Sequence, residues 1–328
     1  MQTSAQPFTL SAQAAVGRIR PGRTIEGISA VLLPFRADHS FDLDAYRNLL
    51  LRTWNAGITP SVNMDTGYSN LLTEKEREMI LDLTQEAAEG RPFVAGAYVE
   101  DKTGNLQSLY EEQIAKITRR GGTPILFQCT ALKAMSDCEV VALYSELGKA
   151  TPAFLAFELG EMFVPFGRIY SIGTYEQLLQ IPSLKGAKHS SLDRVQEWER
   201  LELRDRVRPD FRVYTGNDLA IDMVIYGSDY LLGLSAFHPE AFAMRDRLWK
   251  ENRAEFYALN DLLQYLGFLA FRPPVPAYKH NAAQFLKLRG LLETNLTHPK
   301  AVERPESDVA ILANIHERLE AMMASITF

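Results

Sequence analysis

Short β-rich runs alternate eight times with longer amphipathic segments, and this alternation limits the possible folds more than any other feature of the chain. It is expected where crossover helices connect the strands of a parallel sheet. Eight right-handed units can close into a (β/α)8 barrel, while an open doubly wound sheet uses the same units and is the alternative. The predicted strands are 28–35, 59–65, 93–99, 123–128, 153–159, 184–190, 211–217 and 230–236.

The length of the chain fits one barrel with additions. Its 328 residues exceed the roughly 250 of a typical barrel without requiring a second domain. We therefore expect an N-terminal extension over 1–26, the barrel over 27–250 and a helical region over 251–328 that packs on the barrel. The helices expected in that last region cover 253–270, 280–295 and 306–324.

Several expected helices begin with residues that can cap a helix. Ser or Thr followed three residues later by Glu or Gln forms a capping box, and proline suits the first turn of a helix. The pairs are Thr73 with Glu76, Ser136 with Glu139 and Thr174 with Gln177, and the proline is Pro239.

Composition and charge argue against several classes of partner. A net charge of −6 disfavours nucleic acid and anionic membranes, because both require concentrated basic side chains. No run of about 18 apolar residues predicts a transmembrane helix, and residues 1–27 lack the pattern of a secretion signal. The two cysteines, Cys129 and Cys138, favour a reducing compartment, with the cytoplasm as the default.

Histidine placement gives little support to a metal-dependent barrel enzyme, which we keep as a rival interpretation. The six histidines form no H-x-H pair, and only His189 and His238 lie near predicted strand ends. His189 follows Lys188 and should therefore face the opposite side of its strand. We expect neither a metal nor another cofactor.

In a barrel of this kind the reactive groups lie at the carboxyl ends of the strands. On strand 2, the polar residues Ser61, Asn63 and Asp65 alternate with apolar ones, which directs Asp65 into the mouth. On strand 6, Lys188 shares a face with Gly186 and Leu184. Desolvation on that apolar wall would lower the pKa of the Lys188 amine, as a nucleophile requires, whereas an unremarkable lysine would be a solvated surface charge.

Two further strand ends carry candidate residues. Glu158 ends the apolar strand 5, where burial would raise its pKa and suit it to acid or base work; the alternative is that it begins a solvated loop. On strand 7, Gly216 would let a ligand approach the backbone, and the alternative is a plain turn with a helix cap at Asn217 or Asp218.

Gly186-Ala-Lys-His-Ser-Ser191 is the most specific of several segments that together resemble a known family. It is similar to the G-x-K-[DH]-[ST]-S segment, with its Schiff-base lysine, of the dihydrodipicolinate synthase and N-acetylneuraminate lyase family, and the resemblance covers roughly residues 27–300. Other similar segments are Gly27 to Phe35, Phe41 to Ala45, Asp65 to Ser69, Leu72 to Arg77, Phe93 to Gly96, Gly216 with Asp218, Gly227 to Pro239 and Lys287 to Gly290.

The resemblance implies that Lys188 attacks a substrate carbonyl and forms an imine. Two departures from the family pattern concern proton transfer. Asp65 stands where the family has a relay threonine, and a carboxylate there would repel a substrate carboxylate unless it is protonated or paired. The family's strand-5 tyrosine should fall near Ala156 or Phe157, so Glu158 or Tyr170 would take over its task.

The resemblance thus implies a Schiff-base-forming lyase or aldolase that acts on a 2-keto acid or related carbonyl compound, and we expect Lys188, Asp65 and Glu158 to be its catalytic residues. The expected substrate-binding residues are Thr66, Gly216, Ser235 and Arg168; the last is loosely similar to a family arginine that binds a second substrate's carboxylate. The resemblance also implies a homo-oligomer, a dimer or a tetramer. The alternative function is a non-catalytic barrel, which binds a ligand or has a structural role and has lost the proton relay.

Overall fold

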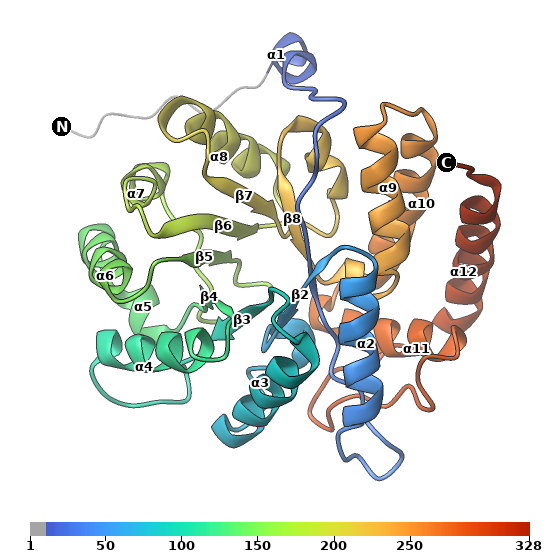
Figure 1. Ribbon diagram of the computed structural model, residues 1–328, viewed down its shortest axis with the longest axis horizontal. Coiled ribbons are helices and arrows are strands. Elements are labelled where there is room, and N and C mark those ends of the chain that lie inside the picture. Colours follow the sequence, from blue (N-terminus) through green and yellow to red (C-terminus); the bar gives the residue numbers. More distant parts are fainter. Residues whose placement is uncertain (1–10) are drawn as a thin grey trace.

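A computed structural model describes residues 11–328 and shows a closed barrel of eight parallel strands, β1 to β8 in chain order (Figure 1). The prediction of a (β/α)8 barrel is confirmed, and the open doubly wound sheet is excluded because β1 pairs with β8. The strands are β1 Gly27–Ala30, β2 Thr59–Val62, β3 Val94–Ala97, β4 Thr123–Leu126, β5 Phe154–Leu159, β6 Leu184–Ser190, β7 Arg212–Thr215 and β8 Asp229–Leu232.

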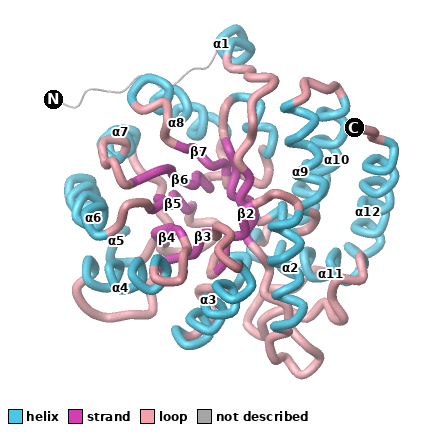
Figure 2. The backbone as a smooth tube through the Cα atoms, viewed as in Figure 1, coloured by secondary structure: helices cyan, strands magenta, loops and turns pink. Residues whose placement is uncertain are grey.

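Helices surround the strands, and the C-terminal helices gather at one side of the barrel, next to α9 (Figures 1 and 2). The seventh connection contains only a 3-10 helix, η2 Ile221–Tyr226. The α-helices are α1 Ala12–Gly17, α2 Leu43–Asn55, α3 Glu74–Ala88, α4 Leu106–Thr118, α5 Thr130–Ala134, α6 Asp137–Ala150, α7 Ile172–Leu178, α8 Arg194–Val207, α9 Pro239–Lys250, α10 Glu255–Ala270, α11 Tyr278–Leu288 and α12 Asp308–Ser325.

The capping chemistry sets most of the predicted helix starts. The boxes at Thr73 with Glu76 and at Ser136 with Glu139 are confirmed, and Pro239 is the first residue of α9. The third box is wrong because Ser171 caps α7 and its hydroxyl accepts from the Thr174 amide, so Thr174 lies inside the helix.

Six of the eight strands end earlier than predicted, and after two of them, β2 and β8, the chain turns into 3-10 helices at the mouth of the barrel. These are η1 Asp65–Gly67 after β2 and η3 Leu234–Ala236 after β8. Asn63 adopts φ 51°, which interrupts the alternation expected on strand 2. The side-chain amide of Asn63 donates to the backbone carbonyl of Arg77 at 2.9 Å, on the helix side of the barrel. Asn63 and Asp65 therefore do not share a face.

The barrel encloses one apolar layer, and a second layer lies between the strands and the helices. The inner layer supplies rigid walls just below the mouth. Its strand residues include Ile28, Ala30, Val94, Ile125, Leu155, Phe157, Leu159, Tyr214 and Leu231.

The described part of the N-terminal extension packs on the barrel. Of the expected extension over 1–26, residues 1–10 lie outside the described part, and the remainder contains α1. The Trp249 indole on α9 donates to the Arg20 carbonyl at 2.9 Å, which ties the extension to the barrel. No helix between residues 11 and 328 has the length and apolar character needed to cross a membrane.

Candidate active site

A narrow pocket opens at the carboxyl ends of the strands, where a (β/α)8 barrel carries its chemistry. It encloses about 300 Å³, including its open mouth. Strands β5 and β6 and the loops after β2, β7 and β8 line it, together with two residues from the C-terminal region. The lining residues are Asp65, Thr66, Phe157, Leu159, Phe163, Lys188, Ser190, Gly216, Asp218, Gly233, Phe271 and Tyr278.

Lys188 lies at the centre of this pocket, between its neighbours Phe157 on β5 and Tyr214 on β7. It is 8% exposed, and its Nζ lies 4.5 Å from the centroid of the Phe157 ring. Gly216 leaves room for the side chain, because a Cβ there would lie 2.7 Å from the Lys188 Cε. Burial lowers the pKa of Lys188 to about 8, against the opposing charges of Asp218 and Asp65.

Asp218 is a second buried ionisable group in the pocket, 4% exposed. Its Oδ1 accepts a hydrogen bond from the Leu234 amide at 2.8 Å. Burial raises the pKa of Asp218 to about 7, although the Leu234 amide and the Lys188 charge oppose the rise. Near neutral pH, the pocket therefore holds an amine that loses its proton easily beside a carboxyl that keeps its proton easily.

The Asp218→Asn variant should shift the pH dependence of the Lys188 amine. The Asp218 charge raises the pKa of Lys188, so its removal should lower that pKa by on the order of one unit. We expect a lower midpoint in the pH dependence of covalent trapping at Lys188. Asp222→Asn, a carboxylate paired with Arg194 outside the pocket, is the control. An unchanged or higher midpoint for Asp218→Asn would contradict this reading.

Asp65 lines the pocket as expected, and a lysine compensates its charge. Lys279 on α11 donates to the Asp65 Oδ1 at 3.0 Å, and the Tyr278 hydroxyl donates to the Oδ2 at 3.1 Å. The Thr66 Oγ1 lies 2.7 Å from the same tyrosine oxygen. Because Asp65 is paired with Lys279, it does not present an uncompensated negative charge to a substrate carboxylate.

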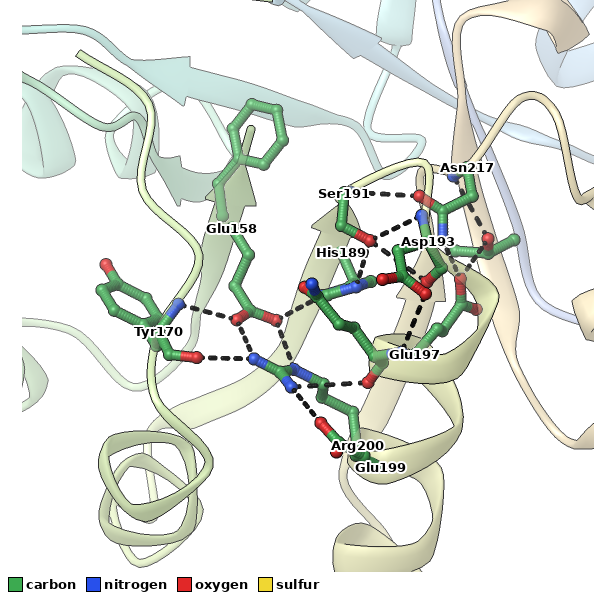
Figure 3. A network of polar contacts seen from close by, with 12 residues as sticks. Glu158, Tyr170, His189, Ser191, Asp193, Glu197, Glu199, Arg200 and Asn217 are labelled. Carbon is green, nitrogen blue, oxygen red and sulfur yellow. Dashed lines mark hydrogen bonds and ion pairs between the residues drawn. The ribbon is translucent and has the colours of Figure 1, made fainter. Parts of the chain in front are cut away.

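Glu158 does not lie at the mouth beside Lys188, and the expectation that its pKa is raised is wrong. Since Phe157 faces the pocket, the next residue faces the helices. There Glu158 accepts from Arg200 on α8 at 2.9 Å and lies 2.7 Å from the His189 Nδ1 (Figure 3). Burial raises the pKa of Glu158, but the charges of Arg200 and His189 outweigh it and lower the pKa to about 2.

His189 faces away from Lys188, as its place in the strand predicts. Its Nε2 lies 2.7 Å from the Ser191 hydroxyl, so both ring nitrogens have partners in the network of Figure 3. Within residues 11–328, no group of three or more His, Cys, Asp or Glu side chains is placed to hold a metal ion.

Two other predicted binding residues lie outside the pocket. Arg168 pairs with Asp137 and donates to the Met135 carbonyl at 2.7 Å. The Ser235 hydroxyl donates to the Ser29 hydroxyl on β1 at 2.8 Å. Tyr170, the other candidate for proton transfer, bonds to Gln128 at 2.8 Å and lies behind the barrel wall.

The structure adds pocket residues that the sequence interpretation did not select. Asp218 belongs to a segment that resembles the family pattern, but the sequence assigns it no role in a site beyond a possible turn or helix cap. Ser190 follows Lys188 on the same face of β6. The Ser190 hydroxyl is buried and makes no hydrogen bond within residues 11–328, so it is available to a ligand. Phe271 and Tyr278 come from the C-terminal region, where no local sequence signal indicates a return to the barrel mouth.

This fold and pocket define a barrel with a buried lysine at the end of its sixth strand, and comparison with known proteins places it in a family. Residues 31–295 match the family model described as "Protein of unknown function (DUF993)". The match spans most of the chain, which therefore belongs to that family.

Curated relatives and solved structures agree with the resemblance seen in the sequence. The chain is 26% identical over 220 residues to a 4-hydroxy-tetrahydrodipicolinate synthase from Cytophaga hutchinsonii, covering 66% of this chain and 70% of that protein. It is 29% identical over 190 residues to a probable 5-dehydro-4-deoxyglucarate dehydratase from Streptomyces coelicolor, covering 56% and 55%. The relatives are thus named as enzymes.

The solved structures are similar in fold. The dihydrodipicolinate synthase of Thermotoga maritima superposes with a TM-score of 0.77 at 18% identity, over 91% of this chain and 99% of that one. A prophage protein of the dihydrodipicolinic acid synthase family from E. coli K12, in complex with pyruvate, gives 0.77 at 16% identity, over 90% and 98%. The comparisons confirm the resemblance to dihydrodipicolinate synthases, and the low identities make this chain a divergent relative of them.

Proposed function

We propose that this protein is a Schiff-base-forming lyase or aldolase that acts on a 2-keto acid or related carbonyl compound. The observation that carries the proposal is Lys188, a buried amine with a lowered pKa at the centre of the pocket. Its neutral nitrogen attacks the carbonyl carbon, and the carbonyl oxygen leaves as water after taking up two protons. The protonated imine then accepts the electron pair of an adjacent bond, which allows carbon–carbon cleavage, its reverse or dehydration.

The surroundings of Lys188 support a small substrate. Phe157, Leu159 and Phe163 line the pocket with apolar side chains, while Asp218 and the Ser190 hydroxyl offer polar contacts. The apolar wall excludes water and so favours the neutral amine over the ammonium form.

Covalent trapping tests the proposal. The protein is incubated with pyruvate, other 2-keto acids and simple aldehydes and ketones in the presence of borohydride, followed by intact mass spectrometry and peptide mapping. We expect an adduct on Lys188, because borohydride reduces an imine to a stable amine. An adduct mapped only to other lysines, or none across the whole panel, would contradict the proposal.

One observation favours the alternative of a non-catalytic, ligand-binding barrel. The pocket position on β5 is Phe157, whose ring cannot transfer a proton. A chain that binds the panel compounds reversibly, with no imine and no turnover, would support this alternative. The alternative loses its basis if another hydroxyl in the pocket performs proton transfer.

We also propose that the protein is a cytoplasmic homo-oligomer. Tyr257, Tyr265 and Phe268 on α10 expose about half of their surface, at 53%, 45% and 55%, which suits a face covered by a second copy. The free cysteines Cys129 and Cys138 suit a reducing compartment. Sedimentation velocity should show a dimer or tetramer, and Phe268→Glu should shift it toward monomer. A monomeric wild type would refute self-association.

A further inference from the structure

The pocket contains a tyrosine that does not come from the barrel strands. Tyr278 begins α11 and is 3% exposed, and its ring stacks on Phe271 with 4.3 Å between the centroids and 17° between the planes. Gly233 lets this ring approach the mouth, because a Cβ there would lie 3.0 Å from the Tyr278 ring. The side chain is therefore fixed by packing on two sides.

The hydroxyl of Tyr278 is also fixed, by two partners with different chemistry. It donates to the Asp65 Oδ2 at 3.1 Å, and its oxygen lies 2.7 Å from the Thr66 Oγ1. Since the Asp65 bond uses the tyrosine's proton, the threonine is the donor in the second bond and orients the tyrosine oxygen. One lone pair of that oxygen stays available to a group in the pocket.

Beyond Tyr278, the chain of polar groups ends in a charge pair. The other carboxylate oxygen of Asp65 accepts from Lys279 at 3.0 Å. Asp65 therefore has one oxygen held by an ammonium group and the other directed at the tyrosine. This arrangement provides a proton acceptor behind the tyrosine, which a lone buried hydroxyl would lack.

We propose that Tyr278 transfers protons between the substrate and Asp65 at the Lys188 imine. This inference deepens the proposed function and rests on it. The substrate proton bonds to the Tyr278 oxygen while the tyrosine's own proton passes to the Asp65 Oδ2. The electron pair left on the substrate moves into the imine, which gives a neutral enamine, and the reverse steps return the proton.

A concerted transfer fits Tyr278 better than a free tyrosinate. Burial, followed by the charge of Asp65, raises the pKa of Tyr278 well above its ordinary value. An isolated tyrosinate would therefore be costly, whereas the concerted transfer keeps the tyrosine neutral and places the gained proton on Asp65.

Hydrogen exchange at carbon tests the inference separately from imine formation. Pyruvate and acetone are incubated with the protein in D2O, and NMR follows the replacement of their methyl protons. Borohydride trapping of the same two compounds reports the Lys188 adduct. In Tyr278→Phe we expect the adduct to persist while enzyme-catalysed exchange falls on the order of 10²- to 10⁴-fold. Tyr170→Phe is the matched control, since its hydroxyl is buried outside the pocket, and it should exchange like the wild type.

The outcomes separate the two proposals. Without a Lys188 adduct from either compound in the wild type, the proposed function itself fails. With the adduct present, equal exchange in Tyr278→Phe and wild type, or no exchange in the wild type, overturns the role of Tyr278.

A second variant covers the case in which Tyr278→Phe does not fold. Asp65→Asn is nearly the same size, and it should also keep the adduct and lose exchange at least tenfold, because the proton acceptor is gone. If Asp65→Asn folds but loses the adduct as well, the network only shapes the pocket and the inference is wrong.

Discussion

Lys188→Ala is expected to abolish the borohydride-dependent adduct and to reduce any turnover on the order of 10³-fold or more, because a covalent nucleophile has no substitute. Lys279 lies nearby but does not line the pocket, and its amine is paired with Asp65 at 3.0 Å, so it should not take over. Mass spectrometry of trapped protein measures the effect. The control is Lys185→Ala, an exposed lysine on the same strand, which should keep the adduct.

The pH dependence of trapping adds a second check on the same residue. Only the neutral amine attacks a carbonyl, and the pKa of Lys188 is lowered to about 8. Trapping should therefore slow about tenfold for each unit of pH below 8 and level off above it. A profile that still rises steeply between pH 9 and about 10.4, the range of an ordinary lysine, would show that the reacting amine is not the buried one.

Glu158→Leu is expected to destabilise the protein by about 3–5 kcal/mol, since it removes the buried partner of the Arg200 charge and leaves only the more exposed Glu199 at 3.3 Å. Arg200 is 3% exposed and Glu158 is fully buried, so water cannot replace the lost ion pair. Urea denaturation measures the change in the free energy of unfolding. Glu161→Gln removes a carboxylate that is 70% exposed and paired with Lys133, and it should change the stability far less, because solvent screens an exposed pair.

The double variant Glu158→Leu with Arg200→Met shows whether the lost stability comes from a buried, poorly paired charge or from a loss of packing. Replacing both partners with apolar groups should restore much of the stability, because no unpaired charge remains. If the double variant is as unstable as Glu158→Leu alone, the ion pair is not the source of the effect. Trapping at Lys188 in the folded fraction of the variant also tests the prediction from the sequence that Glu158 acts as a catalytic acid or base.

The same ion pair predicts how stability depends on pH. The pKa of Glu158 is about 2 in the folded protein, below its ordinary 4.5. A lowered carboxyl pKa adds stability above the unfolded value, and this stability is lost as the pH falls from about 4.5 toward 2. Glu158→Leu should therefore lose less stability over that range than the wild type does.

The fold and the position of Lys188 could be predicted because both rest on local patterns. The alternation of short apolar runs with amphipathic segments specifies the barrel, and alternation within β6 places His189 opposite Lys188. The same reasoning failed for Glu158. To know which side of β5 it faces requires the register that pairs Phe157 with Lys188, and the sequence alone does not fix that register.

Tyr278 and Lys279 could not be found in this way because their contacts are long-range. They meet Asp65 across more than 200 positions of the chain, and the segment that carries them has no motif of its own. Three departures from the family pattern meet in this pocket: Phe157 stands on β5, Asp65 follows β2, and the Tyr278 hydroxyl comes from α11.

The origin of Tyr278 in α11 divides the candidate chemistry between two parts of the chain that can change independently. The barrel carries the Lys188 amine, which attacks the carbonyl. The appended helix α11 carries the Tyr278 hydroxyl and Lys279, whose charge neutralises that of Asp65. Substitutions at the start of α11 could therefore redirect what happens after capture without disturbing a single strand of the sheet. In a family with this layout, we expect members that catalyse different reactions to differ mainly at the start of α11, while the residues of the barrel stay nearly the same.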